Sequence, residues 1–266
     1  MELMDNFFEN VSSENNISDA VNDFVDREVI ELDGNNYMQR FSGADWFDSA
    51  GRLTVAIIGL GGIGSHAALS IAKLGCKVIL NDFDYVENVN MSGQNYMTSD
   101  ISRLKTSATV DKLLRYGIDE NNISCIDSNL LDDNYSVFPN ANIYVLALDS
   151  IDTRRAMYRS ILSKCTDIAS AYIIDGRLTA ETLQVFTCNT KSKYSIDRYF
   201  KSFFDKKDAM PTVCSFKQTF YMASMIGNII ANLIVNISIN RSNEFYVPVP
   251  SFIEYNSRTL DYKYEV

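Results

Sequence analysis

The stretch that decides the fold is TVAIIGLGGIGS, residues 54–65. Its first half is an apolar run typical of a buried strand, and its second half opens a helix. Between them Gly59, Gly61 and Gly64 have the spacing GxGxxG. There the first glycine permits a tight turn, the second lets phosphate approach the backbone, and the third lets helix pack on strand. The helix N-terminus then offers N–H groups to an anion, so the stretch predicts a nucleotide site.

Working outward from that stretch, apolar runs and helical periods alternate along the chain. The expected strands are 54–60, 77–80, 123–127, 142–148, 171–176 and 183–188, and the expected helices are 63–74, 100–116, 152–162 and one beginning near Ser215. This alternation predicts an α/β fold, a Rossmann-like, mainly parallel sheet with flanking helices. Two β-like runs around Asn256 and Ser257 predict a C-terminal β hairpin.

The domain organisation follows from where this pattern starts and pauses. Residues 1–50 are expected to be an N-terminal arm that packs on the body, with a short helix near 19–25. Residues 51–266 are expected to form the nucleotide-binding domain. The polar segment 189–214, which carries interleaved aromatic residues, is expected to be a crossover loop.

Composition excludes several classes of protein. The 266 residues are 46% hydrophobic with a net charge of −10, which argues against sequence-independent nucleic-acid binding. The five cysteines include no CxxC pair, so no zinc site is expected. The N-terminus lacks a signal-peptide core, and we expect a cytoplasmic protein. His66 is the only histidine, so a hydrolase that uses histidine as its catalytic base is not expected.

One segment, Phe216 to Ile239, is apolar and long enough to span a membrane. Within it Ser224, Asn228, Asn232 and Asn236 recur every four residues and form a polar stripe along one helical face. We therefore expect a buried or interface helix and no membrane partner.

Asp82 follows the second expected strand, 18 residues after Gly64. An acid at this place binds ribose hydroxyls in NAD and in ATP alike. An NAD-dependent oxidoreductase therefore remains an alternative at this point. The residues after Asp82 distinguish an NAD-dependent oxidoreductase from an enzyme that uses ATP.

Those residues belong to an ordered series of motifs. In chain order the motifs are the glycine loop 59–65, Asp82-Phe-Asp84-Tyr-Val86, Asn90-Met-Ser-Gly93-Gln94, Lys105 at the head of a helix, and Asp149 followed by Arg154. The series resembles the ThiF/MoeB-type adenylyltransferases, which are related to ubiquitin-activating enzymes. The spacing holds across residues 40–155, and the chain looks like a small, divergent member of that family. The segments 40–46 and 175–177 are also similar to its divergent members.

The resemblance implies an ATP-dependent enzyme that activates the C-terminal carboxylate of a small ubiquitin-like or sulfur-carrier protein as an acyl-adenylate. It also implies a homodimer. The implied nucleotide-binding residues are Gly59, Gly61, Gly62, Gly64, Ser65, Asp82, Asp84, Asn90, Gln94, Lys105 and Asp149. Lys105 and Asp149 are the implied catalytic residues, with Mg²⁺ held by Asp149 through ATP and Arg154 steadying the Asp149 loop.

The chemistry agrees with these roles. A carboxylate that attacks the α-phosphate of ATP brings two anions together, so cations must screen them. Ordinary alternatives remain: Asp149 as a helix N-cap, Lys105 as a solvated lysine, and Asn90 with Gln94 as loop hydrogen-bonding residues.

The chain departs from the family pattern at two arginines. Gly93 stands where family members carry arginine, and the N-terminal segment has Arg40 followed by Gly43, where a second arginine is expected. Arg177, Arg103 or Arg40 could compensate from another direction. Otherwise the chain is a catalytically impaired partner or scaffold that still binds nucleotide.

Some family members pass the activated carboxylate to a cysteine after the sixth strand. Cys214, just before the long helix, and Cys188, at the end of the strand, are the candidates. For Cys214 the helix N-terminus would lower the pKa of the thiol. A buried structural cysteine is the alternative for both. The stretch 191–207 is aromatic and lysine-rich, and could dock the tail of a protein or pack as an amphipathic helix.

Overall fold

The computed structural model describes residues 43–44, 46–132, 139–164, 171–179, 181–203, 219–242 and 246–266. Residues 40–266 form one compact unit. The helix expected near 19–25, most of the arm 1–50, and the residues Arg40 and Cys214 lie outside the described residues.

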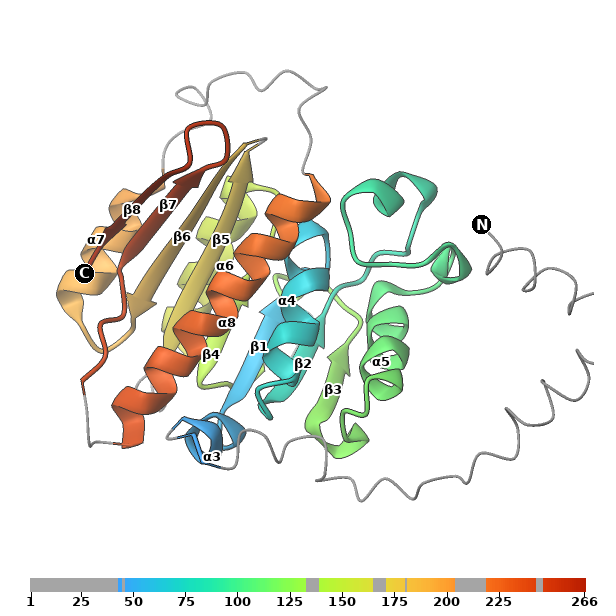
Figure 1. Ribbon diagram of the computed structural model, residues 1–266, viewed down its shortest axis with the longest axis horizontal. Coiled ribbons are helices and arrows are strands. Elements are labelled where there is room, and N and C mark those ends of the chain that lie inside the picture. The colour runs from blue at the N-terminus through green and yellow to red at the C-terminus, as the bar shows by residue number, and fades with distance from the viewer. Residues whose placement is uncertain are drawn as a thin grey trace, which may run out of the picture. The chain divides into compact units, whose positions relative to one another are not determined.

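The described residues contain one eight-stranded sheet in the order β3-β2-β1-β4-β5-β6-β7-β8 (Figure 1). The strands are β1 (Thr54–Ile58), β2 (Lys77–Asn81), β3 (Ile123–Ile126), β4 (Ile143–Leu146), β5 (Tyr172–Thr179), β6 (Thr182–Asn189), β7 (Phe252–Asn256) and β8 (Asp261–Glu265). The first five strands in chain order pair in parallel, and β6, β7 and β8 are added antiparallel. The mainly parallel α/β fold is confirmed, and β7 and β8 form the expected hairpin.

The helices cover both faces of this sheet (Figure 1). They are α3 (Phe47–Gly51), α4 (Gly62–Ala72), α5 (Lys105–Arg115), α6 (Ile151–Lys164), α7 (Lys193–Lys201) and α8 (Phe220–Ser242), with short 3-10 turns η3 (Asn88–Ser92), η4 (Thr98–Asp100) and η5 (Glu120–Asn122). Helices α3, α4, α5 and α8 lie on one face, while α6 and α7 lie on the other.

The central strand β1 shows why its sequence is apolar without interruption. Val55 and Ile57 belong to the core under α4 and α8, whereas Ala56 and Ile58 belong to the core under α6 and α7. Alternate residues of a strand face opposite sides of the sheet, so a strand covered on both faces needs apolar residues at every position.

Helix α8 is a core helix of this unit. It is long and apolar enough to span a membrane, but 56% of its apolar window is buried inside the fold. Gly227 allows close contact with α4, because a Cβ there would lie 2.9 Å from the backbone nitrogen of Ala67. Figure 1 shows the two helices side by side in front of the sheet.

The polar stripe of α8 is used largely within the chain. Asn228 accepts from the hydroxyl of Ser70 at 2.8 Å, and Asn236 donates to the carbonyl of Pro248 at 3.1 Å. Asn240 both donates to and accepts from the backbone of Val247. The stripe therefore anchors α4 and the segment leading to β7.

The expected helix 100–116 was wrong at its start, and the correction bears on the site. The backbone N–H of Ser102 donates to Val86, and that of Lys105 donates to Asp84. Ser102 also has φ of +69°, which a helix does not tolerate. Because the chain before Lys105 pairs with the segment after β2, α5 begins at Lys105.

Candidate active site

The glycine loop joins β1 to α4, and its glycines differ in role. Gly59 has φ of +90°, and a Cβ there would lie 2.8 Å from the carbonyl oxygen of Ala147. Gly64 packs so closely on Gly59 that a Cβ would lie 1.9 Å from its carbonyl oxygen. At Gly61 a Cβ would meet nothing within 4 Å, so the backbone there faces open space. Two glycines thus shape the loop, and Gly61 leaves room for a ligand.

Two side chains hold the residue at the centre of the loop. The Leu60 N–H donates to Asp82 Oδ2 at 2.7 Å, and the Tyr96 hydroxyl donates to the Leu60 carbonyl at 2.8 Å. The other oxygen of Asp82 accepts from the Asp84 N–H at 2.9 Å. Asp82 therefore supports the loop besides facing the cavity described below.

Lys105 is the first residue of α5, opposite the segment after β2. Its Nζ lies 3.0 Å from Asp84 Oδ2 and 3.8 Å from Asp82 Oδ2. The Lys105 side chain is buried, whereas that of Asp84 is exposed. The ordinary alternative of a solvated lysine is therefore wrong, and the ammonium group is held by two acids.

Asn90 and Gln94 lie on the loop that passes over α5. Asn90 Oδ1 accepts from the Glu87 N–H at 2.8 Å as part of a capping box at η3. Gln94 Oε1 is buried and has no hydrogen-bond partner among the described residues. Asn90 thus has a loop-forming role, while the Gln94 amide retains unused hydrogen-bonding capacity.

Asp149 follows β4, and its carboxylate has no hydrogen bond or ion pair within the described part of the chain. The cap of α6 is Ser150, whose hydroxyl accepts from the Thr153 N–H at 3.4 Å, so the N-cap alternative for Asp149 is wrong. Arg154 donates to the carbonyls of Leu146 and Leu148. It steadies the segment before Asp149, as expected.

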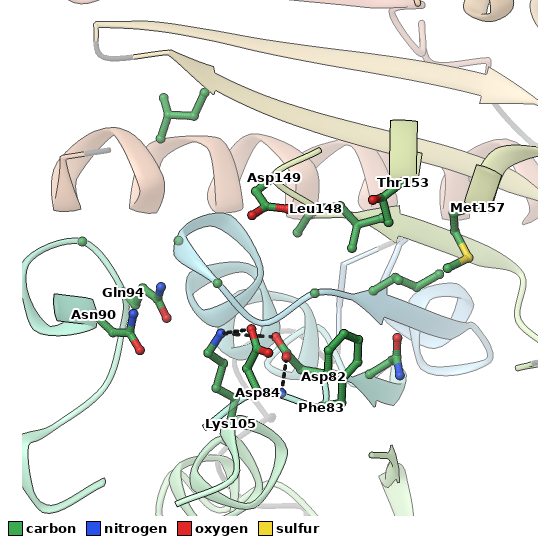
Figure 2. Close-up of a pocket in the computed structure, with 18 of the residues that line it drawn as sticks. Asp82, Phe83, Asp84, Asn90, Gln94, Lys105, Leu148, Asp149, Thr153 and Met157 are labelled. Carbon is green, nitrogen blue, oxygen red and sulfur yellow. Dashed lines mark hydrogen bonds and ion pairs between the residues drawn. The ribbon is translucent and has the colours of Figure 1, made fainter. Parts of the chain in front are cut away.

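One cavity of about 880 Å³ collects these groups at the carboxyl ends of β1, β2 and β4. The order in which strands are added to the sheet reverses between the parallel neighbours β1 and β4, and ligands bind at such a switch point in open α/β sheets. Figure 2 shows Asn90 and Gln94 at one end and Met157 at the other, with Lys105, Asp84 and Asp82 between them and Asp149 across the opening. The predicted residues that line the cavity are Gly59, Gly61, Gly62, Asp82, Asp84, Asn90, Gln94, Lys105 and Asp149.

Gly64 and Ser65, also predicted to bind nucleotide, do not line the cavity. Gly64 is buried against the loop, and the Ser65 hydroxyl donates to the Gly62 carbonyl while accepting from the Asn95 N–H. Their contribution is to the shape of the loop.

Several lining residues escaped the sequence analysis. They are mainly apolar, and they include Phe83, Leu130, Leu131, Leu148 and Met157. Figure 2 shows Phe83 and Met157 away from the end that holds Asn90 and Gln94. Phe83 carried a signal in the sequence, because it stands between Asp82 and Asp84 directly after a strand, at the edge where ligands bind. Met157 carried none, because the face that a helix residue presents depends on how the helix packs.

The arginines proposed as replacements are engaged elsewhere. Arg103 pairs with Asp100 and Asp111, and Arg177 pairs with Asp175 and bonds to Ser202. Neither lines the cavity, so the expectation that they compensate was wrong. Within the described residues, Lys105 is the only basic side chain that lines it.

His66 does not supply the missing charge either. Burial lowers the pKa of His66 and so disfavours the charged form of the ring. The Nε2 atom of His66 lies 3.3 Å from the carbonyl oxygen of Gly93. The His66 ring packs edge-on against the ring of Phe220, with 4.5 Å between the ring centroids. The ring therefore fastens the loop at Gly93 to the start of α8.

Cys188 is unsuited to nucleophilic attack. It is fully buried in the core beneath α6 and α7, and burial raises the pKa of its thiol to about 12. The thiolate form, which is the reactive one, is therefore scarce at neutral pH. Among the described residues no group of three or more His, Cys, Asp or Glu side chains could hold a metal ion on its own.

The comparisons with known proteins agree with this geometry. The chain is 33% identical over 88 residues to ubiquitin-like modifier-activating enzyme 5 of Arabidopsis thaliana and 32% identical over 88 residues to the protein of that name from Oryza sativa subsp. japonica. Each alignment covers 31% of this chain and about a fifth of the relative, 20% and 21%.

Solved structures share the fold over most of the chain. PaaA matches with a TM-score of 0.63 and 18% identity, covering 87% of this chain and 81% of that one. MccB from E. coli, solved with ATP, matches with a TM-score of 0.57 and 22% identity, covering 83% of this chain and 65% of that one. The model of the ThiF family matches residues 34–264. This chain, with its glycine loop, Lys105 and Asp149 around one cavity, belongs to the ThiF family.

Proposed function

We propose that this protein is an adenylyltransferase that binds ATP in the cavity and transfers its adenylate to a carboxylate. The observation that carries the proposal is the meeting, in one cavity, of open space beside the Gly61 backbone, the ammonium of Lys105 and the free carboxylate of Asp149. Membership of the ThiF family and likeness to a ubiquitin-like modifier-activating enzyme support this type of activity.

The cavity fits ATP by the chemistry of its lining. The apolar lining residues, among them Phe83, Leu131 and Met157, suit a purine base. The N–H groups at the start of α4 suit phosphates, because that helix begins without a side-chain cap. The buried, unpartnered oxygen of Gln94 can accept from a hydroxyl of a ligand.

In the proposed reaction a carboxylate oxygen of the substrate attacks the α-phosphorus of ATP. A carboxyl–phosphate bond forms, the bond between the α-phosphorus and the bridging oxygen breaks, and pyrophosphate leaves. Lys105 screens negative charge on the phosphates while its two acids fix its position. Mg²⁺, carried by ATP and held by Asp149, would supply the remaining positive charge.

For the substrate we propose the C-terminal carboxylate of a small ubiquitin-like or sulfur-carrier protein, with the enzyme acting as a homodimer in the cytoplasm. The modifier-activating relatives support the first part, and MccB, solved in complex with MccA, is a neighbour in fold that also receives a partner. Asp149→Ala protein used as bait should retain such a carrier. Sedimentation velocity measures the homodimer.

A second candidate function is that of a catalytically impaired partner that binds ATP without turning it over. It is favoured by the absence of any arginine among the described residues that line the cavity. An arginine that stabilises a transferring phosphoryl group contributes roughly 10³–10⁵ in rate in other systems.

Pyrophosphate exchange into ATP, driven by a candidate carrier protein, tests the proposal. The wild type should exchange, and Asp149→Ala should lose nearly all exchange while keeping its melting temperature, because this carboxylate has no partner to lose. Asp261→Ala on β8, which also removes an exposed acid, is the matched control.

Two results contradict the proposal. ATP binding without exchange from any carrier indicates the impaired partner. Thermal stabilisation by NADH but not by ATP with Mg²⁺ indicates an oxidoreductase.

A further inference from the structure

A buried carboxylate outside the cavity is bound by three side chains from three elements. Asp175 on β5 is completely buried. Its Oδ1 accepts from Arg154 on α6, and its Oδ2 accepts from Arg177 Nε at 2.9 Å and from the Tyr199 hydroxyl of α7 at 2.9 Å. A carboxylate with no access to water is stable only when charged and hydroxyl donors bind it, so all three side chains help to hold the Asp175 carboxylate in the core.

Arg154 connects this cluster to the residues that line the cavity. Besides Asp175, the guanidinium of Arg154 donates to the carbonyl of Leu146, at the end of β4, and to the carbonyl of Leu148. Asp149 is the next residue. Because Arg154 is itself buried, its orientation depends on the carboxylate of Asp175. The position of Asp149 is therefore set in part from the neighbouring strand β5, where Asp175 pairs with Leu146.

The other branch leads to the crossover segment. Arg177 donates to both the carbonyl and the hydroxyl of Ser202, at 2.9 and 3.0 Å, just after α7 ends. Its guanidinium also lies 4.2 Å from the ring centroid of Phe186 and 5.3 Å from that of Phe203. The same carboxylate thus holds the Asp149 segment and the C-terminal end of α7.

We propose that Asp175 is a positioning residue for the adenylation site, and that it couples the place of Asp149 to the place of α7. It touches no ligand and acts through Arg154. The catalytic part of this inference rests on the proposed function; the structural coupling does not. If α7 shifts, Tyr199 and Arg177 carry the change to Asp175 and so to the segment before Asp149.

The informative variant is Tyr199→Phe, which removes one hydrogen bond to Asp175 and keeps the ring in its core site. Asp175→Asn is the stronger variant, since it leaves the buried Arg154 and the partly buried Arg177 without their anion. Glu254→Gln is the matched control: Glu254 accepts from Gln184 at 2.7 Å between β6 and β7, and reaches neither Arg154 nor the cavity.

We expect Tyr199→Phe to lower kcat for pyrophosphate exchange about tenfold with little change in KM for ATP, because a displacement of about 1 Å at a catalytic group can cost roughly a hundredfold. The concentration of Mg²⁺ needed for half-maximal exchange should rise, because Asp149 is displaced. Hydrogen exchange of the amides at 147–150 should become faster. Assays run well below the melting temperature keep unfolding out of the result.

Three outcomes would overturn the inference: unchanged hydrogen exchange at 147–150 in both folded variants, an unchanged Mg²⁺ requirement, or equal losses in Glu254→Gln. If Asp175→Asn does not fold, Tyr199→Phe alone decides. If the wild type shows no pyrophosphate exchange, the proposed function fails, while hydrogen exchange at 147–150 still decides the coupling.

Discussion

At the scale of single residues, two glycines of the loop are needed for different reasons: Gly59 for the fold and Gly61 for the ligand. Gly59 combines φ of +90° with contact to the Ala147 carbonyl, so any side chain there is strained in conformation and in space. At Gly61 the space beside the backbone is open. The two positions are close in sequence but should respond differently to the same added methyl group.

We expect Gly59→Ala to lower the free energy of unfolding by about 1–3 kcal/mol. Gly61→Ala should cost less stability than Gly59→Ala and weaken ATP binding, because its methyl group occupies the space a phosphate would enter. Urea unfolding and calorimetric titration measure the two effects. Equal stability losses in both variants, with ATP affinity intact, would contradict the assignment.

Lys112 on α5 is a buried base that the proposed reaction does not use. Its Nζ has no hydrogen-bond partner among the described residues and lies 5.0 Å from the ring centroid of Tyr96. Burial lowers the pKa of Lys112 to about 8, and the charge of Asp100 opposes this shift; burial also lowers the pKa of the nearby His66. Below pH 8 the folded protein therefore carries a poorly solvated charge.

The sign of the pH effect follows from proton counts. Between pH 8 and the ordinary lysine pKa of 10.5, the unfolded chain keeps a proton that the folded chain has released. The stability contributed by this group therefore rises with pH across that window, by at most about 3 kcal/mol. Urea unfolding of wild type and Lys112→Met at pH 7.5 and pH 10 should show the variant losing this rise. Parallel pH profiles would argue against it.

At the scale of elements, the crossing of α4 and α8 fixes how the longest helix lies on the sheet. Gly227 meets the backbone of Ala67, and Gly176 on β5 leaves room for Ile226 and Ile230 of α8. These small residues let an apolar helix come close to its neighbours, which explains a hydrophobic segment of 23 residues inside one unit.

Gly227→Val should destabilise the protein by about 1–3 kcal/mol, because its branches would overlap backbone atoms of α4 that cannot move independently. Asn232→Ala, on the exposed side of the same helix, should change stability by less than about 0.5 kcal/mol. Both are measured by chemical denaturation. An unchanged free energy of unfolding in Gly227→Val would mean that α4 and α8 do not cross as closely as described.

At the scale of the whole molecule, the excess of negative charge means that ATP can bind only together with additional cations. The chain carries a net charge of −10, and the cavity is lined by Asp82, Asp84 and Asp149 against the single described base Lys105. Four phosphate charges cannot be added to this field without other cations.

Removal of Mg²⁺ with EDTA should therefore weaken ATP binding by on the order of 100-fold or more, the scale of about 3 kcal/mol. Calorimetric titration with and without Mg²⁺ measures this, with Lys77→Met, at the opposite end of β2, as a control that should behave as wild type. ATP affinity independent of Mg²⁺ would imply that a basic group beyond the described residues enters the cavity.

The sequence by itself determined the α/β fold and the glycine loop, because these depend on local pattern: apolar runs and glycine spacing. The family resemblance implied that Lys105 and Asp149 lie at one site, and both line the cavity. The sequence could not determine where α5 begins, since pairing of residues 102–105 with 84–86 overrides the helical pattern. Nor could it place Met157 in the cavity or exclude Arg103 and Arg177 from it. The direction of a side chain and the partner of a charge are set by elements distant in sequence, so only the tertiary structure decided them.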